Sequence, residues 1–560
     1  QVIRINLYFF EVKMLPRFEN YNDLYEKFKW NIPYYYNIAS DTVDKDKYQN
    51  RTALINILDS GKIEKWTFSD FKISANKLAN VFDYFKLKAN ARVGIILGQC
   101  PEAAISHMAC FKSGRISIPL FSLFGTEALY YRLMNSKASL VICDDISLIK
   151  IQEIYEKLPD LKVIICVNGD KHEGYTFNFK KLLDNASPNY KTKITKPNDP
   201  AIIIYTSGTT GGPKGALLPH QSLLGHIPGV EMPHEFLSSL DPVQDVFWTP
   251  ADWAWIGGLF DVLLPAWHFG IPVISYRSGK FDPEFAFHLM SKFKVRNTFL
   301  PPTALKMMKA VNLSKNINGL NLRTVGSGGE ALGEELLEWG NKILGVGINE
   351  FYGQTECNLT VSNNGALMDS KQGSIGKPVP GHVVKLMDKN NQFISKEGCD
   401  GEIVVKYDTP VAFLKYWDND EETKKKVIDG WLHTGDYAYK DDEGYLYFKG
   451  REDDIINSSG YRIGPSEVED CILSYSEVEM VAVIGVPDKL RGEIIKAFII
   501  PKNKGLIISQ NEKIKEDIKK YVKQKLAAHE YPRMIEFINE LPMTTTGKII
   551  RKTLREDNRI

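Results

Sequence analysis

Short apolar runs alternate with helical patterns from about residue 50 onward. The run at residues 92–97, RVGIIL, is followed by a helical pattern at 101–113 and by a second apolar run at 116–120. Runs rich in β-branched residues, separated by helices, are typical of parallel strands whose sheet is covered by those helices. The pattern therefore predicts an α/β fold. Further predicted strands lie at 139–143, 163–167, 201–205, 272–275, 297–300 and 322–325.

The pattern changes after Gly376. Short apolar runs separated by Asp, Asn and Gly turns predict a small antiparallel unit. After Arg451, a helix beginning near Pro465, two strands and a lysine-rich helix predict a small α+β domain. We thus predict a large N-terminal domain at 1–451, made of parallel sheets covered by helices plus the antiparallel unit, and a small C-terminal α+β domain at 452–560. The runs after Gly376 are 383–387, 402–405, 436–448, 481–485, 497–500 and 511–526.

Composition narrows the class of protein. A chain of 560 residues is too long for one compact core, which agrees with more than one domain. The 70 basic and 69 acidic side chains give a formal net charge of +1, so nothing favours nucleic acid as a partner. Seven cysteines without a CxxC pair indicate a reducing compartment, and ten histidines without metal-ligand spacing argue against structural zinc.

Targeting signals are not evident in the sequence. No apolar run approaches the roughly 18–20 residues that span a bilayer, so no membrane span is predicted. Residues 1–13 lack the length and cleavage site of a secretory signal and are left out of the fold prediction. The expected location is the cytoplasm.

A glycine-rich loop follows a predicted strand at residues 204–215, with the sequence IYTSGTTGGPKG. Glycines allow close backbone approach, so successive N–H groups converge on an anion, and the hydroxyls and Lys214 add donors. The loop is not a Walker A motif, because Pro213 precedes the lysine and Gly215 follows it. A polyphosphate site is predicted at Thr206, Ser207, Gly208, Thr209, Thr210 and Lys214.

This loop resembles the signature of the adenylate-forming (ANL) superfamily, which includes acyl-CoA synthetases, firefly-type luciferases and peptide-synthetase adenylation domains. Other segments follow in the family's order over roughly residues 40–555. The resemblance implies an AMP-forming acyl-CoA synthetase of the short/medium-chain acyl-CoA and acetyl-CoA group. Such an enzyme converts a carboxylic acid and ATP to an acyl-adenylate and then passes the acyl group to coenzyme A. The matching segments are 326–330 (GSGGE), 352–356 (YGQTE), 432–436 (LHTGD), 450–451 (GR) and 542–548 (PMTTTGK).

The resemblance assigns roles in the first half-reaction. Lys548 would bridge the carboxylate and the phosphate, Thr355 would hydrogen-bond the α-phosphate, and Glu356 would bind Mg²⁺, a hard cation that takes oxygen ligands. Asp436 would accept hydrogen bonds from the ribose hydroxyls. The implied nucleotide site further includes Gly328, Gly329, Glu330, Tyr352, Gln354 and Arg451.

The second half-reaction brings a thiol to the acyl carbonyl. Ser459, Gly460 and Arg462 lie in a segment, SSGYR, that resembles the family's CoA-binding segment. Asp453 matches the position of the family's hinge. The resemblance implies that the small domain alternates between two orientations, so that Lys548 and Gly460 serve one site at different times.

The acyl pocket is predicted at Trp255, Gly257 and Gly353. Acetate-specific members of the family carry a tryptophan where this chain has Gly353, so an open channel and a short-to-medium-chain fatty acid are expected. Cys357 and Asn358 stand where the family often has a glycine. Four alternatives remain open: an acetyl/propionyl-CoA synthetase whose pocket the tryptophans close, an enzyme that loads a carrier protein, a luciferase-like oxygenase, and a catalytically silent nucleotide-binding protein.

Overall fold

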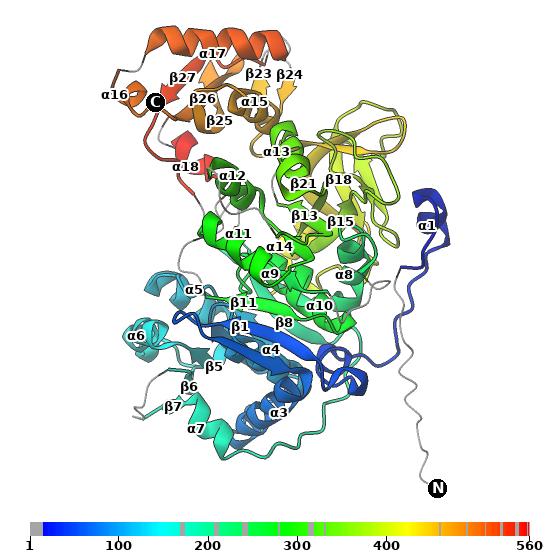
Figure 1. The fold of residues 1–560 in the computed structure, drawn as a ribbon, viewed down its shortest axis with the longest axis vertical. Helices are drawn as coiled ribbons and strands as arrows, with labels where there is room; N and C mark the ends of the chain where they lie inside the picture. The colour runs from blue at the N-terminus through cyan, green and yellow to red at the C-terminus, as the bar shows by residue number, and fades with distance from the viewer. Residues whose placement is uncertain are drawn as a thin grey trace.

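The computed structural model describes residues 15–168, 174–206, 212–237, 245–277, 281–311, 319–329, 332–458, 461–488, 491–509, 511–526, 530–543, 548–556 and 558. Figure 1 shows a small lobe formed by the C-terminal strands and helix α17 at one end of the molecule, with the N-terminal strands and helices at the other end. In the described part of the chain, no helix is long and apolar enough to cross a membrane.

The first large sheet has eight strands, and its centre is parallel. The central strands are largely buried runs, such as Val163–Cys166, and helices connect the strands, as the sequence predicts. In sheet order the strands are β19 (Lys415–Tyr416), β9 (Lys214–Pro219), β8 (Pro200–Thr206), β4 (Ile116–Pro119), β3 (Arg92–Ile96), β5 (Ala138–Cys143), β6 (Val163–Cys166) and β7 (Thr176–Asn178).

The second large sheet has nine strands and carries the central YGQTE motif at one side. In sheet order its strands are β16 (Lys377–Pro378), β15 (Cys357–Ser362), β14 (Ile348–Gln354), β13 (Thr324–Gly328), β12 (Asn297–Phe299), β10 (Phe247–Trp248), β11 (Val273–Tyr276), β1 (Thr52–Ile57) and β2 (Ile63–Thr67).

Both large sheets depart from the prediction at their edges. They are mixed, because β9, β2, β15 and β16 run antiparallel to their neighbours. Only Thr355 and Glu356 separate β14 from β15, and a connection this short forces antiparallel pairing. The predicted fold class is otherwise confirmed.

Two smaller sheets follow along the chain. The predicted antiparallel unit is a five-stranded sheet, and the C-terminal part forms another against which α17 packs through Ile518 and Val522, both fully buried. Their strands are β17 (Val384–Met387), β18 (Gly401–Lys406), β20 (Val427–Ile428), β21 (Trp431–Lys440) and β22 (Leu446–Arg451), then β23 (Ile456–Ser458), β24 (Tyr461–Ile463), β25 (Val478–Asp488), β26 (Gly492–Pro501) and β27 (Met534–Phe537).

The α-helices cover the sheets and connect their strands. They are α1 (Tyr21–Lys27), α2 (Ile38–Asp41), α3 (Phe68–Tyr84), α4 (Pro101–Ser113), α5 (Thr126–Ser136), α6 (Asp145–Ile154), α7 (Phe179–Asp184), α8 (Ser222–Glu231), α9 (Ile256–Gly258), α10 (Leu264–Phe269), α11 (Pro283–Lys292), α12 (Pro302–Ala310), α13 (Glu334–Trp339), α14 (Asp420–Lys426), α15 (Pro465–Leu473), α16 (Gly505–Ser509), α17 (Glu512–Lys525) and α18 (Arg551–Glu556).

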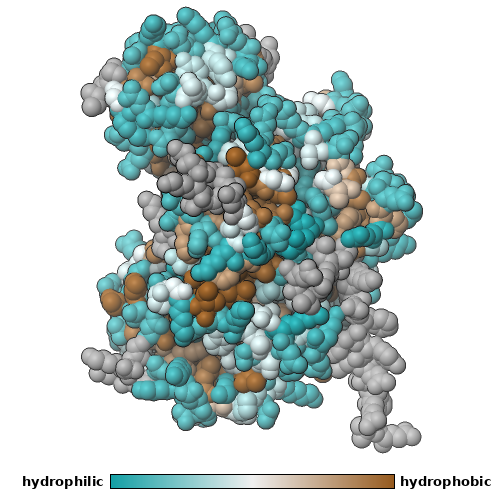
Figure 2. All heavy atoms as spheres, viewed as in Figure 1, coloured by the Kyte–Doolittle hydropathy of each residue, from teal (hydrophilic) through white to brown (hydrophobic). Residues whose placement is uncertain are grey.

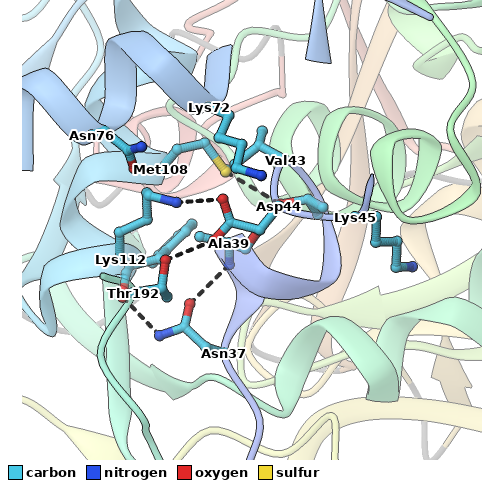
Figure 3. A network of polar contacts seen from close by, with 12 residues as sticks. Asn37, Ala39, Val43, Asp44, Lys45, Lys72, Asn76, Met108, Lys112 and Thr192 are labelled. Atoms are coloured by element: carbon cyan, nitrogen blue, oxygen red, sulfur yellow. Dashed lines mark hydrogen bonds and ion pairs between the residues drawn. The ribbon is translucent and has the colours of Figure 1, made fainter. Parts of the chain in front are cut away.

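A buried polar network ties the segment after α2 to α4 (Figure 3). The ammonium of Lys112, 1% exposed, pairs with Oδ1 of Asp44, and the hydroxyl of Thr192 donates to Oδ2 of Asp44 at 2.7 Å. Nearby, the amide of Asn37 donates to the carbonyl of Phe111 at 2.8 Å. Burial lowers the pKa of Lys112, while Asp44 opposes that shift. Both oxygens of Asp44 have partners, so the network is satisfied within the protein.

Candidate active site

Lys548 and the glycine pair at the end of β13 lie together. Gly329 has a φ of +100°, and a Cβ built on it would lie 3.6 Å from Nζ of Lys548. In Figure 1 the C-terminal lobe lies over the α12 and α13 side of the molecule. Two motifs far apart in the sequence thus meet at the carboxyl end of a strand.

Asp436 is the meeting point of three motifs. Its Oδ2 accepts from the Tyr352 hydroxyl at 2.7 Å and from the Gln354 amide at 2.6 Å. Asp436 pairs with Arg451 in the register of β21 and β22, and Nε of Arg451 lies 3.8 Å from Oδ1. Asp436 is 5% exposed, and burial raises its pKa, although Arg451 and the two hydrogen bonds oppose the shift. Among the described residues, none donates a hydrogen bond to Oδ1, which leaves an acceptor for a ligand hydroxyl.

Lys426 joins this group, although the sequence does not single it out. Its ammonium donates to Oε1 of Gln354 at 2.8 Å and to the carbonyl of Thr434 at 3.1 Å. The lysine lies at the end of α14, within a run of three lysines that resembles an ordinary solvated face. It fixes the Gln354 amide so that its nitrogen faces Asp436.

A second cluster joins the glycine-rich loop to the central motif through Tyr416. The Tyr416 hydroxyl donates to Oε1 of Glu356, and Nζ of Lys214 lies 5.5 Å from the centre of the Tyr416 ring. Glu356 is 6% exposed and lies in the turn between β14 and β15. Lys214 also pairs with Glu422 of α14. The hydrogen bonds from Lys214 and then Lys425 lower the pKa of Glu422 to about 2.

These contacts place the Lys214 ammonium and the Glu356 carboxylate on either side of Tyr416. The sequence predicts Lys214 and Glu356 but not Tyr416 or Glu422. For Glu422, a sequence signal is the Asn419 cap of α14, which fixes the start of the helix that carries Glu422.

Several remaining predicted residues lie around these clusters. Thr355 is half-buried in the turn before Glu356, and Thr206 ends β8, where its hydroxyl donates to the Lys214 carbonyl at 3.4 Å. Asp453 is exposed in the turn after β22, and Arg462 lies in β24. The predictions for Ser207, Gly208, Thr209, Thr210, Glu330, Ser459 and Gly460 lie outside the described residues.

The expectation that Gly353 leaves an open channel is wrong, because backbone atoms of the same hairpin occupy the space beside it. A Cβ on Gly353 would lie 2.3 Å from the Leu359 nitrogen and 2.8 Å from the Asn358 carbonyl carbon. The space beside the glycine is filled by the neighbouring strand of its own hairpin, where β14 and β15 change register. Gly353 therefore allows close backbone packing.

The tryptophans near the predicted pocket have different roles. Trp253 is 1% exposed and Trp248 is 4% exposed, so both belong to the core. Trp255 is half-buried and packs against the rings of Phe121 and Phe124 at 5.8 and 6.0 Å. Apolar side chains gather across the middle of the face shown in Figure 2.

Two acidic side chains face each other where α15 meets the large domain. A Cβ on Gly333 would lie 3.1 Å from Oδ1 of Asp470. Burial raises the pKa of Asp470 to about 7, although Lys306 opposes the shift. Burial and then the charge of Asp470 raise the pKa of Glu350 to about 8. Because both pKa values are raised, this arrangement favours the protonated forms of Asp470 and Glu350.

Comparison with known proteins identifies the class. The AMP-binding enzyme family matches residues 42–417, and the AMP-binding enzyme C-terminal domain matches residues 467–548. The chain therefore belongs to the AMP-binding enzyme family. The boundary predicted between residues 451 and 452 falls between the two matches and stays a prediction.

Similar proteins are CoA ligases. Acyl-coenzyme A synthetase ACSM3, mitochondrial, of Rattus norvegicus is 33% identical over 551 residues, covering 96% of this chain and 93% of the rat protein. Acetyl-coenzyme A synthetase of Bacillus subtilis (strain 168) is 31% identical over 566 residues, covering 97% of each chain. The solved structure of the anthranilate CoA ligase AuaEII in complex with anthranoyl-AMP has a TM-score of 0.86 at 28% identity, covering 94% of this chain and 98% of that chain. The predicted class, an AMP-forming CoA ligase, is confirmed.

Proposed function

We propose that this chain joins a small carboxylic acid to coenzyme A through an acyl-adenylate, with the residue roles that the sequence motifs imply. The observation that carries the proposal is the meeting of Lys548 with Gly329, beside the clusters around Asp436 and Glu356. Two anions must meet in the first half-reaction, so the site has to supply positive charge at fixed positions. Lys548 and Lys214 are the side chains proposed for that task.

In the first half-reaction a carboxylate oxygen attacks the α-phosphorus of ATP, and the bond to the bridging oxygen of pyrophosphate breaks. Lys548 holds the carboxylate and α-phosphate together, and Thr355 donates to the phosphate. Asp436 accepts from the ribose through Oδ1, the oxygen that Tyr352 and Gln354 leave open. Lys214 turns from Glu422 to the β- and γ-phosphates.

Glu356 is the proposed Mg²⁺ ligand. Mg²⁺ in nucleotide sites is usually bound by one or two carboxylates together with phosphate oxygens. Glu356 fits this scheme, because Tyr416 donates to Oε1 and Oε2 has no hydrogen bond among the described residues. Phosphate oxygens and water would complete the coordination, as is usual for Mg²⁺. Bound there, the ion would neutralise phosphate charge.

In the second half-reaction the CoA thiol adds to the acyl carbonyl and AMP leaves, so that one oxygen of the acid departs with AMP. Ser459, Gly460 and Arg462 are proposed to line the thiol path, and Asp453 is proposed as the hinge. Support for a hinge comes from Asp454, the next residue, which pairs with Arg555 of α18 at 2.7 Å. That pairing couples the turn to the C-terminal lobe.

A role in the metabolism of short-chain fatty acids, including substituted ones, and a cytoplasmic location belong to the same proposal. The mitochondrial names of several relatives make location a matter for direct measurement.

The test is pyrophosphate release by the purified chain with a panel of small acids, with and without CoA. Acid-dependent exchange of pyrophosphate into ATP without CoA, and thioester only with CoA, are expected. Thioester on a carrier protein but not on CoA would indicate a carrier-loading enzyme. Absence of acid-dependent exchange would refute the proposal.

A further inference from the structure

A buried acidic side chain lies behind the predicted acyl pocket, on a π-helical turn, η4 (Leu259–Leu263). Asp261 is 4% exposed, and its Oδ1 accepts from the Asn358 amide at 2.6 Å. Asn358 is 5% exposed and lies in β15, two residues after Glu356. The Asn358 side chain therefore adds a second polar group beside Asp261.

The pair is unusual because the carboxyl group is not fully satisfied. Among the described residues, Oδ2 of Asp261 has no hydrogen-bond partner and no cation pairs with the group. An isolated buried charge is costly, and burial raises the pKa of Asp261 well above its ordinary value. Asp245 provides a contrast. Its Oδ2 also lacks a partner, but Arg296 and Arg323 compensate its charge.

A continuous series of contacts connects Asp261 to the reacting end of the site. A Cβ on Gly257 would lie 3.6 Å from Oδ2 of Asp261 and 2.8 Å from the Phe299 ring. The rings of Phe299 and Phe351 are 5.3 Å apart.

The series then reaches the strand end that holds the catalytic lysine. A Cβ on Gly328 would lie 2.6 Å from the Phe351 ring, and the next residue, Gly329, adjoins Lys548. Asp261 and Lys548 thus lie at the two ends of one series of neighbouring residues, with the aromatic rings of Phe299 and Phe351 between them.

We propose that Asp261, positioned by Asn358, determines substrate specificity, and that the acid activated by this chain carries a hydroxyl or ammonium group at the end away from its carboxylate. The inference rests on the proposed function and names the substrate class for the same site. A distal donor would hydrogen-bond Oδ2 of Asp261, the oxygen that adjoins Gly257. A pocket built to hydrogen-bond a substrate group rejects analogues that lack it, because its buried polar atom is then unpaired.

The test uses acids with the same number of non-hydrogen atoms, compared by kcat/KM for pyrophosphate release. One series is butyrate, β-hydroxypropionate and β-alanine; the other is pentanoate, γ-hydroxybutyrate and γ-aminobutyrate. In at least one series the hydroxy or amino acid should exceed the alkyl acid by about tenfold or more. Preference for the alkyl acid in both series overturns the inference, while the proposed function stands. Failure of every acid, with no exchange of pyrophosphate into ATP, overturns both.

Two variants separate charge from hydrogen bonding. Asp261→Asn keeps a hydrogen-bonding group without charge, so a preference for the hydroxy acid should survive and a preference for the amino acid should be lost. Asp261→Leu should reverse either preference in favour of the alkyl acid. If Asp261→Leu does not fold, Asp261→Ala takes its place and should likewise abolish the preference for the hydroxy acid. Unchanged ratios in Asp261→Asn for an amino acid, or in Asp261→Leu for a hydroxy acid, contradict the inference.

Asp245→Asn is the matched control. Asp245 and Arg296 lie at the amino ends of β10 and β12, opposite the strand ends that carry the site. This variant removes a buried carboxylate of similar exposure, so it reports any general effect of the lost charge. The ratios of kcat/KM should equal those of the unmodified chain, and an equal change in this variant would refute a specific role of Asp261.

Discussion

The carboxyl group of Asp44 differs in its hydrogen bonding from the carboxyl groups of Glu356, Asp436 and Asp261. Both oxygens of Asp44 have partners within the chain, the Lys112 ammonium and the Thr192 hydroxyl. In the other three, the hydrogen bonds that the described part of the chain donates reach one oxygen of each carboxyl. Asp44 lies where two segments are joined, whereas the other three lie along the proposed path of ATP and acid.

This difference distinguishes a carboxyl group that stabilises the fold from carboxyl groups that are able to bind a ligand. A buried polar group is stable when its hydrogen bonds are complete. An incomplete one keeps an acceptor that a ribose, a metal ion or a substrate group could use. Asp245 marks the limit of the comparison, because its open oxygen is compensated by neighbouring arginines and has no path to the site.

The largest expected effect is on stability at the complete network. Lys112→Met removes the cation from a buried pair, and breaking such a pair costs about 3–5 kcal/mol. Because Asp44 is 17% exposed, we expect about 3 kcal/mol of lost unfolding free energy. Urea unfolding measures it. Lys137→Met, which breaks an exposed pair with Asp418, is the control and should cost no more than about 1 kcal/mol. A loss for Lys112→Met as small as the control would contradict the structural role.

The next effect is on catalysis. Lys548→Ala should lower acyl-adenylate formation by about 100-fold or more, because it removes one preorganised charge from the reacting groups. Transfer from preformed adenylate to CoA should be unchanged, because the proposed second step uses the other domain orientation. Single-turnover measurement of each half-reaction tests this. An equal loss of rate in both half-reactions would contradict the role assigned to Lys548 in adenylate formation.

A smaller effect concerns Gly353. Gly353→Ala should lower kcat/KM about tenfold for every acid alike, because the new Cβ would displace the hairpin that carries Glu356. Gly125→Ala is the control, since a Cβ there meets nothing within 4 Å. A change in chain-length preference without loss of overall activity would instead restore the channel interpretation of Gly353.

The smallest effect is a pH dependence at the contact between α15 and the large domain. The docked pKa of Asp470, about 7, lies above its ordinary value of 3.8, so docking is favoured at low pH and weakens as pH rises through about 7. Adenylate formation should therefore fall a few-fold between about pH 6 and pH 8.5. Asp470→Asn should flatten that part of the profile. An identical profile in the variant would show that Asp470 does not control docking.

Motifs and buried strands were predictable from the sequence because each is a local pattern. The runs at 92–97 and 163–167 correspond to β3 and β6, and the motifs identified the family. The antiparallel edges were missed because short apolar strands do not reveal the direction of their neighbours. Gly353 was misread because the absence of a side chain says nothing about which atoms fill the space.

Contacts across the fold were beyond the sequence. Asp261 and Asn358 are separated by 97 residues, and Tyr416 and Glu356 by 60. Each of these residues is unremarkable in its own segment. Only the packing of η4 and of the β19 segment against the central hairpin brings Asp261 and Tyr416 to the hairpin that carries Glu356.

The acyl-adenylate is the central claim, and the fate of a carboxylate oxygen tests it most directly. A substrate acid labelled with heavy oxygen in its carboxylate is turned over with ATP and CoA, and the products are analysed by mass spectrometry. The account predicts one labelled oxygen in AMP for each thioester formed and none in pyrophosphate. Label in inorganic phosphate, or AMP without label, would contradict an acyl-adenylate.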